Sequence, residues 1–388
     1  MRVGILTHAY PRHDGDVAGA FLERLALGLV TRGHAVHVLA PADTGRGGEQ
    51  TRHGVAITRV RYAPARAETL AYTGMMLAAL RSPAGWTWFS SLLWHQARAV
   101  RSLWTRERLD VLHVHWWVPG GLSAWLARRP YLVTLHGMDV VLLERSAAAR
   151  FLARRVLGRA AAVTAVSSDL ADRAARALAF DRNRIDVQPM PIEAARFAQT
   201  SRGGGGVVTV GRLMPRKRLI LLLEALALLR AGGRSLPLTI IGDGPERARL
   251  ETCVAQLQLG DQVRFLGAMP PAHVAAALGD ADVFAFPALG EGFGLAAAEA
   301  LVSGVPVIAT RDGGGVTDIV PASGGGRLVA PDVREIARAI EDLVTDPAAR
   351  GLAAAAGAAL RRRLEPAAVA AHFEAVYQRV ATGSRTGT

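Results

Sequence analysis

The chain contains very little cysteine and lysine, and it has no long apolar run. Cys253 is the single cysteine among 388 residues, so no disulfide can form within the chain, which suits a reducing compartment. No run of about 18 apolar residues occurs, and the first residues lack the apolar core and cleavage site of a signal peptide. We therefore expect a cytoplasmic protein without a membrane-spanning helix.

Lysine is nearly absent although the chain is strongly basic. The formal net charge is +13, and Lys217 is the only lysine among the basic residues. Such a charge attracts polyanions, anionic membrane surfaces and phosphorylated substrates. The preference for arginine indicates a compositional habit, however, and no recognised nucleic-acid-binding motif accompanies the charge. We expect no nucleic-acid partner.

Short apolar segments of β type alternate with helical patterns along the chain. This alternation is the signature of βαβ units and parallel sheets, so the fold class is α/β. In the first half a helix is expected over 19–32, with Gly33 as its cap. The strands expected there are 2–7, 35–39, 55–60, 111–115, 131–135 and 162–166.

A run of four glycines interrupts this pattern. Gly203–Gly206 carries no side chains to pack, so it is expected to form a linker or an exposed turn. A second α/β series follows, with strands expected at 207–211, 237–241, 262–266, 282–286 and 305–309. We predict an amino-terminal domain over 1–195, a second domain over 203–365, and a carboxy-terminal helix and tail over 366–388.

The segment from Glu291 to Glu299 follows an expected strand and is the strongest functional motif. Its Gly292-Phe293-Gly294 portion lets backbone approach a ligand closely, and the alanine-rich stretch begins a helix. Amide hydrogens at a helix start attract phosphate and sugar oxygens. The two glutamates are spaced to accept hydrogen bonds from sugar hydroxyls, although a glycine loop with two unrelated acids would have the same pattern.

The segment from Gly211 to Arg218 lies at the end of the first strand of the second series. Ligands of doubly wound sheets bind outside such carboxyl ends. Arg212 offers a planar fork and Lys217 a compact ammonium, which together suit a diphosphate. The single lysine falls here, which indicates that a point charge is needed at this position. A solvated basic turn is the competing interpretation.

Two further motifs are weaker. Gly242-Asp243-Gly244 follows a strand and is predicted to shape the nucleotide end of a cleft, although most such turns are only turns. His136 ends a strand at the expected lip of the cleft, where a histidine can donate a hydrogen bond or share a proton near neutral pH. A lone histidine is more often structural.

Two pairs of potential metal ligands are discounted. His113 and His115 lie on one face of a strand, but no third ligand accompanies them. Asp280 and Asp282 have the Asp-x-Asp form of some sugar transferases, yet they directly precede an apolar strand, where acids commonly end a helix or loop. We predict no metal site.

These motifs, in this order, resemble glycosyltransferase family 4, retaining enzymes of the GT-B fold that use nucleotide sugars. The resemblance covers nearly the whole chain, and its specificity lies in the joint order and spacing of the motifs. They are 7–21, 32–34, His136-Gly137, 163–167, Gly211–Leu213 with Lys217, Gly242–Pro245, 265–267, 291–299, 304–308 and Gly313-Gly314. The resemblance implies two Rossmann-like domains facing each other across a cleft, the first binding the acceptor and the second the donor.

The resemblance also implies roles for individual residues. Arg212 and Lys217 should neutralise the donor diphosphate and replace a metal ion, so no cofactor is expected. Glu291 should bind the transferred sugar and Glu299 the ribose hydroxyls, while His136 should lie beside the donor sugar. The remaining donor-binding positions are Gly19, which should approach a phosphate, and Gly242, Gly267, Phe293, Gly294 and Leu295.

The implied activity is hexosyl transfer from a nucleoside-diphosphate sugar to a glycan or lipid-linked acceptor, in cell-surface polysaccharide or glycoconjugate biosynthesis. Four positions depart from the family pattern and blur the identity of the donor. The first glycine loop reads Val17-Ala18-Gly19 instead of paired glycines, Ala288 replaces a common serine, Arg218 a common glycine, and Asp318 a usual glutamate.

Other functions compete with this one. A nucleotide-sugar epimerase or a glycan phosphorylase has the same fold, but the phosphorylase needs a pyridoxal-binding lysine and Lys217 is already assigned. A nicotinamide dehydrogenase needs Gly-x-Gly-x-x-Gly after the first strand, where the chain has Thr7–Pro11. An inactive binding module conflicts with the intact Lys217, Glu291 and Glu299. Transfer to a small soluble acceptor stays open.

A segment rich in tryptophan and arginine suggests a membrane surface as a further partner. Its apolar residues are Met75, Met76, Trp86, Trp88, Phe89, Trp94 and Trp104, and its basic residues are Arg81, Arg98, Arg101, Arg106 and Arg108. A second basic helix carries Arg145, Arg150, Arg154, Arg155 and Arg159. Tryptophan suits the headgroup region and arginine attracts anionic lipids. A core of tryptophans beneath a solvated basic face would give the same pattern.

Overall fold

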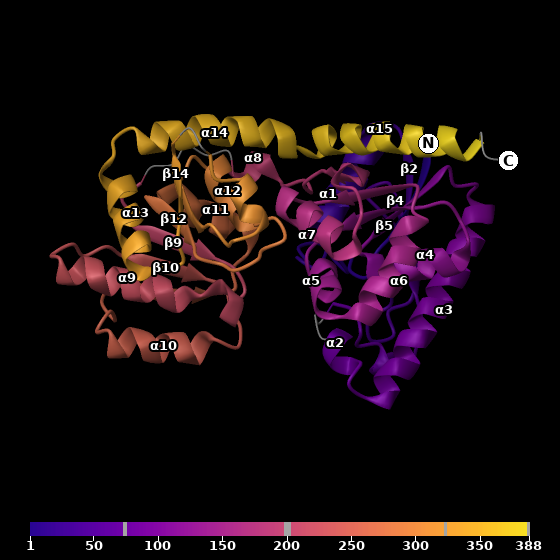
Figure 1. The fold of residues 1–388 in the computed structure, drawn as a ribbon, viewed down its shortest axis with the longest axis horizontal. Helices are drawn as coiled ribbons and strands as arrows, with labels where there is room; N and C mark the ends of the chain where they lie inside the picture. Colours follow the sequence, from indigo (N-terminus) through magenta and orange to yellow (C-terminus); the bar gives the residue numbers. More distant parts are fainter. Residues whose placement is uncertain (73–75, 198–202, 322–323, 386–388) are drawn as a thin grey trace. The chain divides into compact units, whose positions relative to one another are not determined.

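The computed structural model describes residues 1–72, 76–197, 203–321 and 324–385. The chain divides into two compact units (Figure 1). Unit 1 comprises Met1–Pro191 and Pro366–Thr388, and unit 2 comprises Ile192–Glu365. Each unit is an α/β domain, which confirms the predicted fold class of two Rossmann-like domains.

Unit 1 is built on an eight-stranded sheet in the order β3-β4-β2-β1-β5-β6-β7-β8. Its strands are β1 Arg2–Leu6, β2 Ala35–Pro41, β3 Gly48–Arg52, β4 Val55–Val60, β5 Val111–His115, β6 Leu132–Leu135, β7 Ala162–Ala165 and β8 Ile185–Val187. All neighbouring pairs are parallel except β3 with β4. β3 escapes sequence prediction because four of its five residues are polar and its side chains lie outside the core.

The helices of unit 1 begin where local chemistry favours a start. They are α1 Ala20–Thr31, α2 Met76–Ala79, α3 Pro83–Arg106, α4 Leu122–Ala127, α5 Met138–Arg145, α6 Ala147–Gly158, α7 Ser168–Leu178 and α15 Pro366–Arg385. The Ser82 hydroxyl accepts from the Gly85 amide at the start of α3, where Pro83 occupies the first turn. The α5–α7 helices follow the strands β6 and β7 as crossover connections.

The carboxy-terminal helix belongs to unit 1. The sequence predicts a helix and tail over 366–388, and the structure places this helix, α15, against α1. At their contact, Gly28 leaves no room for a side chain beside the Pro366 carbonyl. Arg32 donates to the Glu374 carboxylate over 2.7 Å, and the Tyr377 hydroxyl lies 2.7 Å from His113 Nδ1 in the core. Because the contacting residues are far apart in the sequence, no local sequence pattern predicts that α15 packs on unit 1.

Unit 2 is built on a six-stranded, fully parallel sheet in the order β11-β10-β9-β12-β13-β14. Its strands are β9 Val207–Val210, β10 Leu238–Ile241, β11 Val263–Gly267, β12 Val283–Phe286, β13 Val307–Thr310 and β14 Gly326–Val329. Its helices are α8 Ala194–Phe197, α9 Leu219–Ala231, α10 Arg247–Gln256, α11 Pro271–Asp280, α12 Leu295–Val302, α13 Val333–Thr345 and α14 Ala349–Leu364. This strand order is that of a dinucleotide-binding Rossmann sheet.

The glycine run is a docked turn of unit 2. The Gly204 and Gly206 amides donate to the Asp282 carboxylate over 2.8 and 2.9 Å, and the Gly205 amide donates to the Asp280 carbonyl. Arg350 pairs with the same Asp282 carboxylate at 2.8 Å. Asp282 therefore anchors the entry to β9. The two units divide at Pro191, before the glycine run.

Candidate active site

Each sheet has one place where the strand order reverses. In unit 2 the reversal lies between β9 and β12, and in unit 1 it lies between β1 and β5. Loops that leave the carboxyl ends of two such strands run in opposite directions, which opens a crevice where ligands of doubly wound sheets bind. Residues of the predicted motifs follow three of these strands, namely Gly211–Arg218 after β9, Pro287–Glu291 after β12 and Thr7–Pro11 after β1. Trp116, which the sequence analysis did not single out, follows β5.

In unit 2, Lys217 and Glu291 form an ion pair at this reversal. Lys217 Nζ lies 3.0 Å from Glu291 Oε1 and 4.3 Å from the centre of the Phe286 ring, and each side chain of the ion pair is only 12% exposed. Arg216 approaches the same carboxylate oxygen at 3.4 Å. Burial lowers the pKa of Lys217, and the Glu291 carboxylate opposes that shift. The ammonium is thus held in place by a single carboxylate.

The glycine loop after β13 fixes the backbone of Glu291. Its amide donates to the Gly313 carbonyl and its own carbonyl accepts from the Gly315 amide, each over 2.8 Å. Gly314 adopts a φ of 72°, and a Cβ atom there would lie 2.6 Å from the Glu291 carbonyl oxygen. The glycines after β13 therefore hold Glu291 beside Lys217.

Arg218 stands where the family commonly has glycine, and its backbone adopts a conformation that favours glycine. Its φ is 49°, in the left-handed region that glycine occupies without strain. The guanidinium donates two bonds to Asp312, at 2.7 and 2.8 Å, and others to Thr310 Oγ1 and the Pro287 carbonyl. These contacts tie the loop after β9 to the loops after β12 and β13.

The Gly242–Gly244 turn packs against the Lys217 loop. Gly242 and Gly244 have positive φ, and a Cβ atom on either would clash with the Gly211 or Leu213 carbonyl oxygen, at 2.0 and 2.4 Å. The Gly242 amide donates to Gly267 over 2.7 Å. Packing within the chain thus accounts for these two glycines, and their contact with a nucleotide stays a prediction.

The other predicted donor-binding residues surround the start of α12. Gly294 caps the helix with a φ of 91°, Phe293 is buried, and Leu295 is the first helical residue. Glu299 lies a little over one turn further along and is half-buried. Arg212 follows Gly211 and is exposed, without an ion pair to any residue the structure describes. Their ligand contacts remain predictions.

Unit 1 has a pocket of about 370 Å³ at its own strand reversal. His8 and Ala9 after β1, Trp116 after β5, and Asp139 at the start of α5 contribute to its wall. Most of the other lining side chains are apolar, namely Ala18, Leu70, Met76, Val118, Pro119, Met138 and Leu142. Such a lining suits a ligand with an apolar body and polar groups at one end.

Asp139 is the acid of this pocket, and the sequence analysis did not single it out. Its Oδ1 accepts from the amides of His136, Gly137 and Val140, at 2.8–3.1 Å. Its buried Oδ2 has no hydrogen-bond partner among the described residues. Burial raises the pKa of Asp139 to about 6, against the opposing effect of the amides. The signal available was an acid three residues after His136, in the first turn of the predicted helix.

His136 belongs to a buried cluster of histidines. His136 Nε2 lies 2.9 Å from His115 Nδ1, and the His136 ring packs against Trp116 at 4.2 Å between centres. His113 is held by Tyr377 and by Thr134 Oγ1. Burial is the main cause that lowers the pKa of each of these histidines, to about 3 for His113 and well below the usual range for His115 and His136. All are therefore neutral at pH 7.

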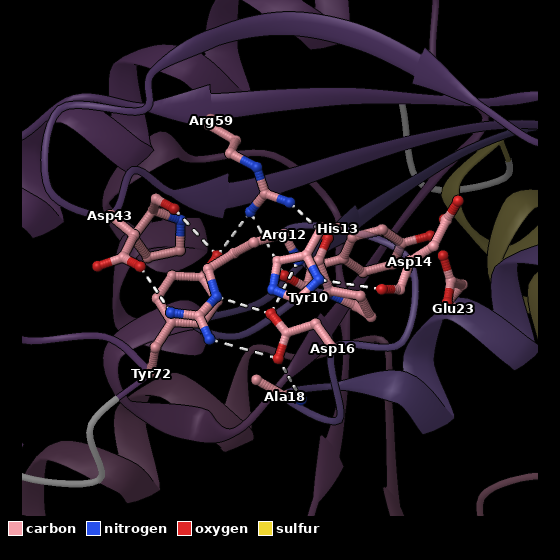
Figure 2. A network of polar contacts seen from close by, with 12 residues as sticks. Tyr10, Arg12, His13, Asp14, Asp16, Ala18, Glu23, Asp43, Arg59 and Tyr72 are labelled. Carbon is pink, nitrogen blue, oxygen red and sulfur yellow. Dashed lines mark hydrogen bonds and ion pairs between the residues drawn. The ribbon is translucent and has the colours of Figure 1, made fainter. Parts of the chain in front are cut away.

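An arginine network shapes the loop after β1 (Figure 2). Arg12 donates to Asp16 and Asp43, each over 2.7 Å, and lies over the Tyr72 ring. The buried Arg59 donates to the Tyr72 hydroxyl over 2.7 Å and to the carbonyl oxygen of the loop residue before Arg12. Tyr72 lines the pocket, so this network sets one of its walls.

Gly19 ends the same loop and caps α1 with a φ of 76°. A Cβ atom there would lie 2.5 Å from the Ala9 carbonyl oxygen. The chain's own backbone therefore requires glycine at this position, and an approach to phosphate stays a prediction. Within unit 2 the structure brings Lys217 and Glu291 together. Within unit 1 it places His136 behind the pocket wall, packed against the lining residue Trp116.

The described residues contain neither a candidate metal site nor a candidate membrane-spanning helix. No group of three or more histidine, cysteine or acidic side chains in them is arranged to hold a metal ion. None of the described helices is both long enough and apolar enough to cross a membrane.

Comparison with known proteins identifies two matching families. Residues 18–191 match the family described as Glycosyl transferase 4-like domain, and residues 193–363 match Glycosyl transferases group 1. Phosphatidyl-myo-inositol mannosyltransferase of Mycobacterium leprae is 30% identical over 404 residues, which cover 98% of each chain. A 2-deoxystreptamine glucosyltransferase of Streptomyces kanamyceticus is 31% identical over 62% of this chain and 69% of its own.

Solved structures of similar fold agree with this. Sucrose-phosphate synthase from Thermosynechococcus elongatus superposes with a TM-score of 0.79 at 20% identity, covering 99% of this chain and all of its own. HepE of Anabaena, in complex with UDP and glucose, gives a TM-score of 0.72 at 20% identity, covering 97% of this chain and all of its own. At such identity these likenesses establish the fold.

Proposed function

Because this chain belongs to the family 4 type of glycosyltransferases, we propose that it transfers a sugar from a nucleoside-diphosphate sugar to an acceptor in glycoconjugate biosynthesis. The observation that carries the proposal is the buried Lys217–Glu291 ion pair at the strand reversal of unit 2. A diphosphate leaving group gains negative charge as the glycosidic bond breaks, and fixed cations stabilise that charge. Lys217 supplies one such cation and the exposed Arg212 supplies a second.

In this proposal Glu291 has two partners in turn. Before the donor binds, its carboxylate holds the Lys217 ammonium. When the diphosphate engages Lys217, Glu291 accepts hydrogen bonds from the hydroxyls of the transferred sugar. Glu299, on the α12 helix whose start is at Gly294, accepts from the ribose hydroxyls. Retention of anomeric configuration is part of the proposal and rests on the family resemblance. NMR spectroscopy of the product's anomeric proton tests it.

Metal independence is a further part of the proposal. Its support is electrostatic, since two cationic side chains can do the work of a divalent ion on the diphosphate. We expect full transfer activity in the presence of a chelator. Loss of activity with a chelator, and its recovery with magnesium or manganese, would overturn this part alone.

The acceptor is proposed to bind in the unit 1 pocket. Its apolar lining, with Asp139 Oδ2 and His8 Nδ1 atoms that have no hydrogen-bond partner within the described ranges, suits an acceptor that has an apolar body and a hydroxyl. The Asp139 Oδ2 atom accepts that hydroxyl, which gives a buried carboxylate oxygen the partner it lacks in the described residues. The 2-deoxystreptamine and phosphatidylinositol acceptors in the relatives' names indicate that both soluble and lipid-linked acceptors occur among the relatives.

Contact with an anionic membrane is proposed for α3 and α6. Trp94 is 63% exposed and Trp86 is 55% exposed on α3, while Phe151 is exposed on α6. Phe89 is buried and Trp88 is half-buried, so part of the predicted aromatic set belongs to the core. Met75 lies outside the described residues. Binding to anionic vesicles that fades with salt and weakens in Trp86→Ala/Trp94→Ala would support this part, and no binding at low salt would contradict it.

A panel of nucleotide sugars tests the central proposal. Thermal stabilisation identifies the donor that binds, and slow hydrolysis of that donor shows bond cleavage without an acceptor. We expect one donor to raise the melting temperature of the wild type and to be hydrolysed, with both effects lost in Lys217→Ala. A panel without any stabilisation or hydrolysis would contradict a nucleotide-sugar enzyme.

A further inference from the structure

A second hollow of unit 1, of about 610 Å³, is lined by four arginines. Arg101 comes from α3, Arg128 and Arg129 follow α4, and Arg159 follows α6. The Trp125 ring forms part of the same wall. No acidic residue is among the lining residues, so four positive charges face one space. We name it the arginine pocket.

The arginine pocket lies at the opposite edge of the sheet from the candidate active site. Arg128 and Arg129 directly precede β6, and Arg159 precedes β7. His136, by contrast, follows β6. Because β6 and β7 are parallel, the two arginine segments meet at the amino edge of the sheet, and the histidine cluster lies at the carboxyl edge. A ligand in the arginine pocket would therefore lie away from the candidate active-site residues of unit 1.

The arginines of this pocket are held in place without neutralisation. Arg101 donates to the Ala127 and Leu126 carbonyls, which fixes it against the end of α4. The Arg159 guanidinium lies 5.9 Å from the centre of the Trp125 ring. None of the pocket's four arginines forms an ion pair with a residue in the described part of the chain. Positive charge is therefore concentrated there and is uncompensated by the protein.

Two further donors in the pocket wall have no acceptor. Trp125 Nε1 and Arg129 Nε are buried, and neither has a hydrogen-bond partner in the described ranges. Buried donors are almost always paired, so these two indicate an acceptor supplied from outside the chain. Their place beside the uncompensated arginines indicates that the acceptor carries negative charge.

An arginine-rich composition alone does not produce this arrangement. Other arginines of unit 1 are paired with carboxylates: Arg12 lies 2.7 Å from Asp16, and Arg173 lies 2.7 Å from Glu144. Where arginine is merely a solvated basic residue, nearby acids or open solvent balance it. Four converging guanidinium groups in one hollow, without an acid, differ from that pattern.

We propose that the arginine pocket binds a phosphate group with at least two negative charges, either a pyrophosphate or a terminal phosphomonoester. Guanidinium forks match phosphate oxygens in bidentate pairs, and several forks in one space suit a multiply charged group. The ligand is either a soluble phosphate compound or the headgroup of an anionic phospholipid. This site does not depend on the proposed transfer activity.

Calorimetry with inorganic pyrophosphate on the full chain tests the site. Lys217→Ala serves as the parent, because it removes the proposed donor cation that would also bind the probe. We expect the parent to bind pyrophosphate, and the addition of Arg128→Asn and Arg159→Gln to weaken that affinity about tenfold or more. Asparagine tolerates the left-handed conformation of Arg128, whose φ is 56°. Arg159→Gln alone, expected to weaken binding by a smaller factor, is the fallback if the double change unfolds.

A charge-matched control separates the pocket from general basicity. Arg46 and Arg66 are exposed in unit 1, and Arg46→Gln/Arg66→Gln removes the same charge. We expect this control to bind pyrophosphate as the parent does. Equal affinity in the pocket variant and the parent, or equal loss in pocket variant and control, would overturn the proposal.

Sedimentation with vesicles distinguishes the two sources of phosphate. Vesicles of phosphatidylcholine with phosphatidic acid carry the phosphomonoester, and vesicles of phosphatidylcholine alone are the blank. If the source is lipid, the pocket variant loses binding to the acidic vesicles relative to the control variant. If the source is soluble, vesicle binding is the same in both variants while pyrophosphate binding differs. Absence of both differences contradicts the site.

Discussion

The two units share one α/β plan but differ in how they hold polar groups at the strand reversal. All seven tryptophans, all five tyrosines and every histidine except His273 belong to unit 1. Its pocket is lined by His8, whose pKa burial lowers, and by Asp139, whose pKa burial raises. Unit 2 has neither tryptophan nor tyrosine, and it holds its lysine against a carboxylate with glycine-rich loops.

This difference in the polar groups of the two sites indicates which kind of ligand each site suits. A buried ion pair keeps charge available for an anionic partner, whereas desolvated neutral groups suit a partner with little charge. Under the proposed function, the strand-reversal site of unit 2 therefore suits a diphosphate, and the pocket at the strand reversal of unit 1 suits an acceptor hydroxyl with an apolar body. The four predictions below test the contrast, from the largest expected effect to the smallest.

Removing the cations of unit 2 should have the largest effect on activity. In Lys217→Ala or Arg212→Ala the diphosphate charge is uncompensated in the transition state, which costs about 2–4 kcal/mol of activation free energy. Steady-state rates with the active donor measure this, and circular dichroism checks that the fold is retained. The exposed Arg216, changed to alanine, is the control and should cost less. Wild-type turnover in both variants would remove the assignment.

Acid should destabilise unit 1 before unit 2. The folded-state pKa is lowered to about 4 for His8 and about 3 for His113, so the unfolded chain binds protons below pH 6.5 that the folded chain rejects. The free energy of unfolding therefore falls as the pH drops from 6.5 towards 4, by roughly 3 kcal/mol for each such histidine. Asp139 opposes this, because its raised pKa favours the folded state as acid protonates it, but it is one group against several.

Tryptophan fluorescence reports this transition for unit 1 alone, since unit 2 has no tryptophan. Denaturant unfolding at pH 7 and pH 5, together with hydrogen exchange of unit 2 peptides, compares the two units. We expect the fluorescence midpoint to fall at pH 5 while unit 2 exchange changes little. A parallel loss of protection in both units would contradict the contrast.

Glu291 and Glu299 should bind different parts of the donor, Glu291 the sugar and Glu299 the nucleotide. Glu291→Ala should weaken the nucleotide sugar but leave affinity for the free nucleoside diphosphate, whereas Glu299→Ala should weaken both by about tenfold. Calorimetry with the diphosphate alone decides between them. Equal losses in the two variants would show that the glutamates do not have separate roles.

Arg218→Gly should have the smallest effect. Glycine relieves the left-handed backbone at this position, while the change removes the half-exposed ion pair with Asp312 and two hydrogen bonds. These opposing terms should leave the free energy of unfolding within about 1 kcal/mol of the wild type. Urea denaturation measures the difference. A much larger loss would mean that the contacts of Arg218 outweigh the relief of its left-handed backbone, against this prediction.

Local patterns predicted much of the fold and identified the Lys217 and Glu291 loops as a candidate site, whose ligand contacts stay predictions. Strand and helix periodicity indicated the two largely parallel sheets, and glycine with charge at strand ends indicated the Lys217 and Glu291 loops. Asp139 was missed because a single acid after His136 resembles an ordinary helix start. Its raised pKa depends on burial, which no local pattern reports. The packing of α15 on unit 1 was missed for the same reason, because the contact is long-range.

The most direct test of the division between the units is calorimetry with the nucleoside diphosphate of the active donor. Three full-length proteins are compared, namely wild type, Lys217→Ala and Asp139→Asn. We predict that Lys217→Ala weakens the diphosphate by at least about tenfold, while Asp139→Asn binds it as tightly as the wild type and yet loses transfer to the acceptor. Unchanged affinity in Lys217→Ala, or equal weakening in Asp139→Asn, would contradict the account.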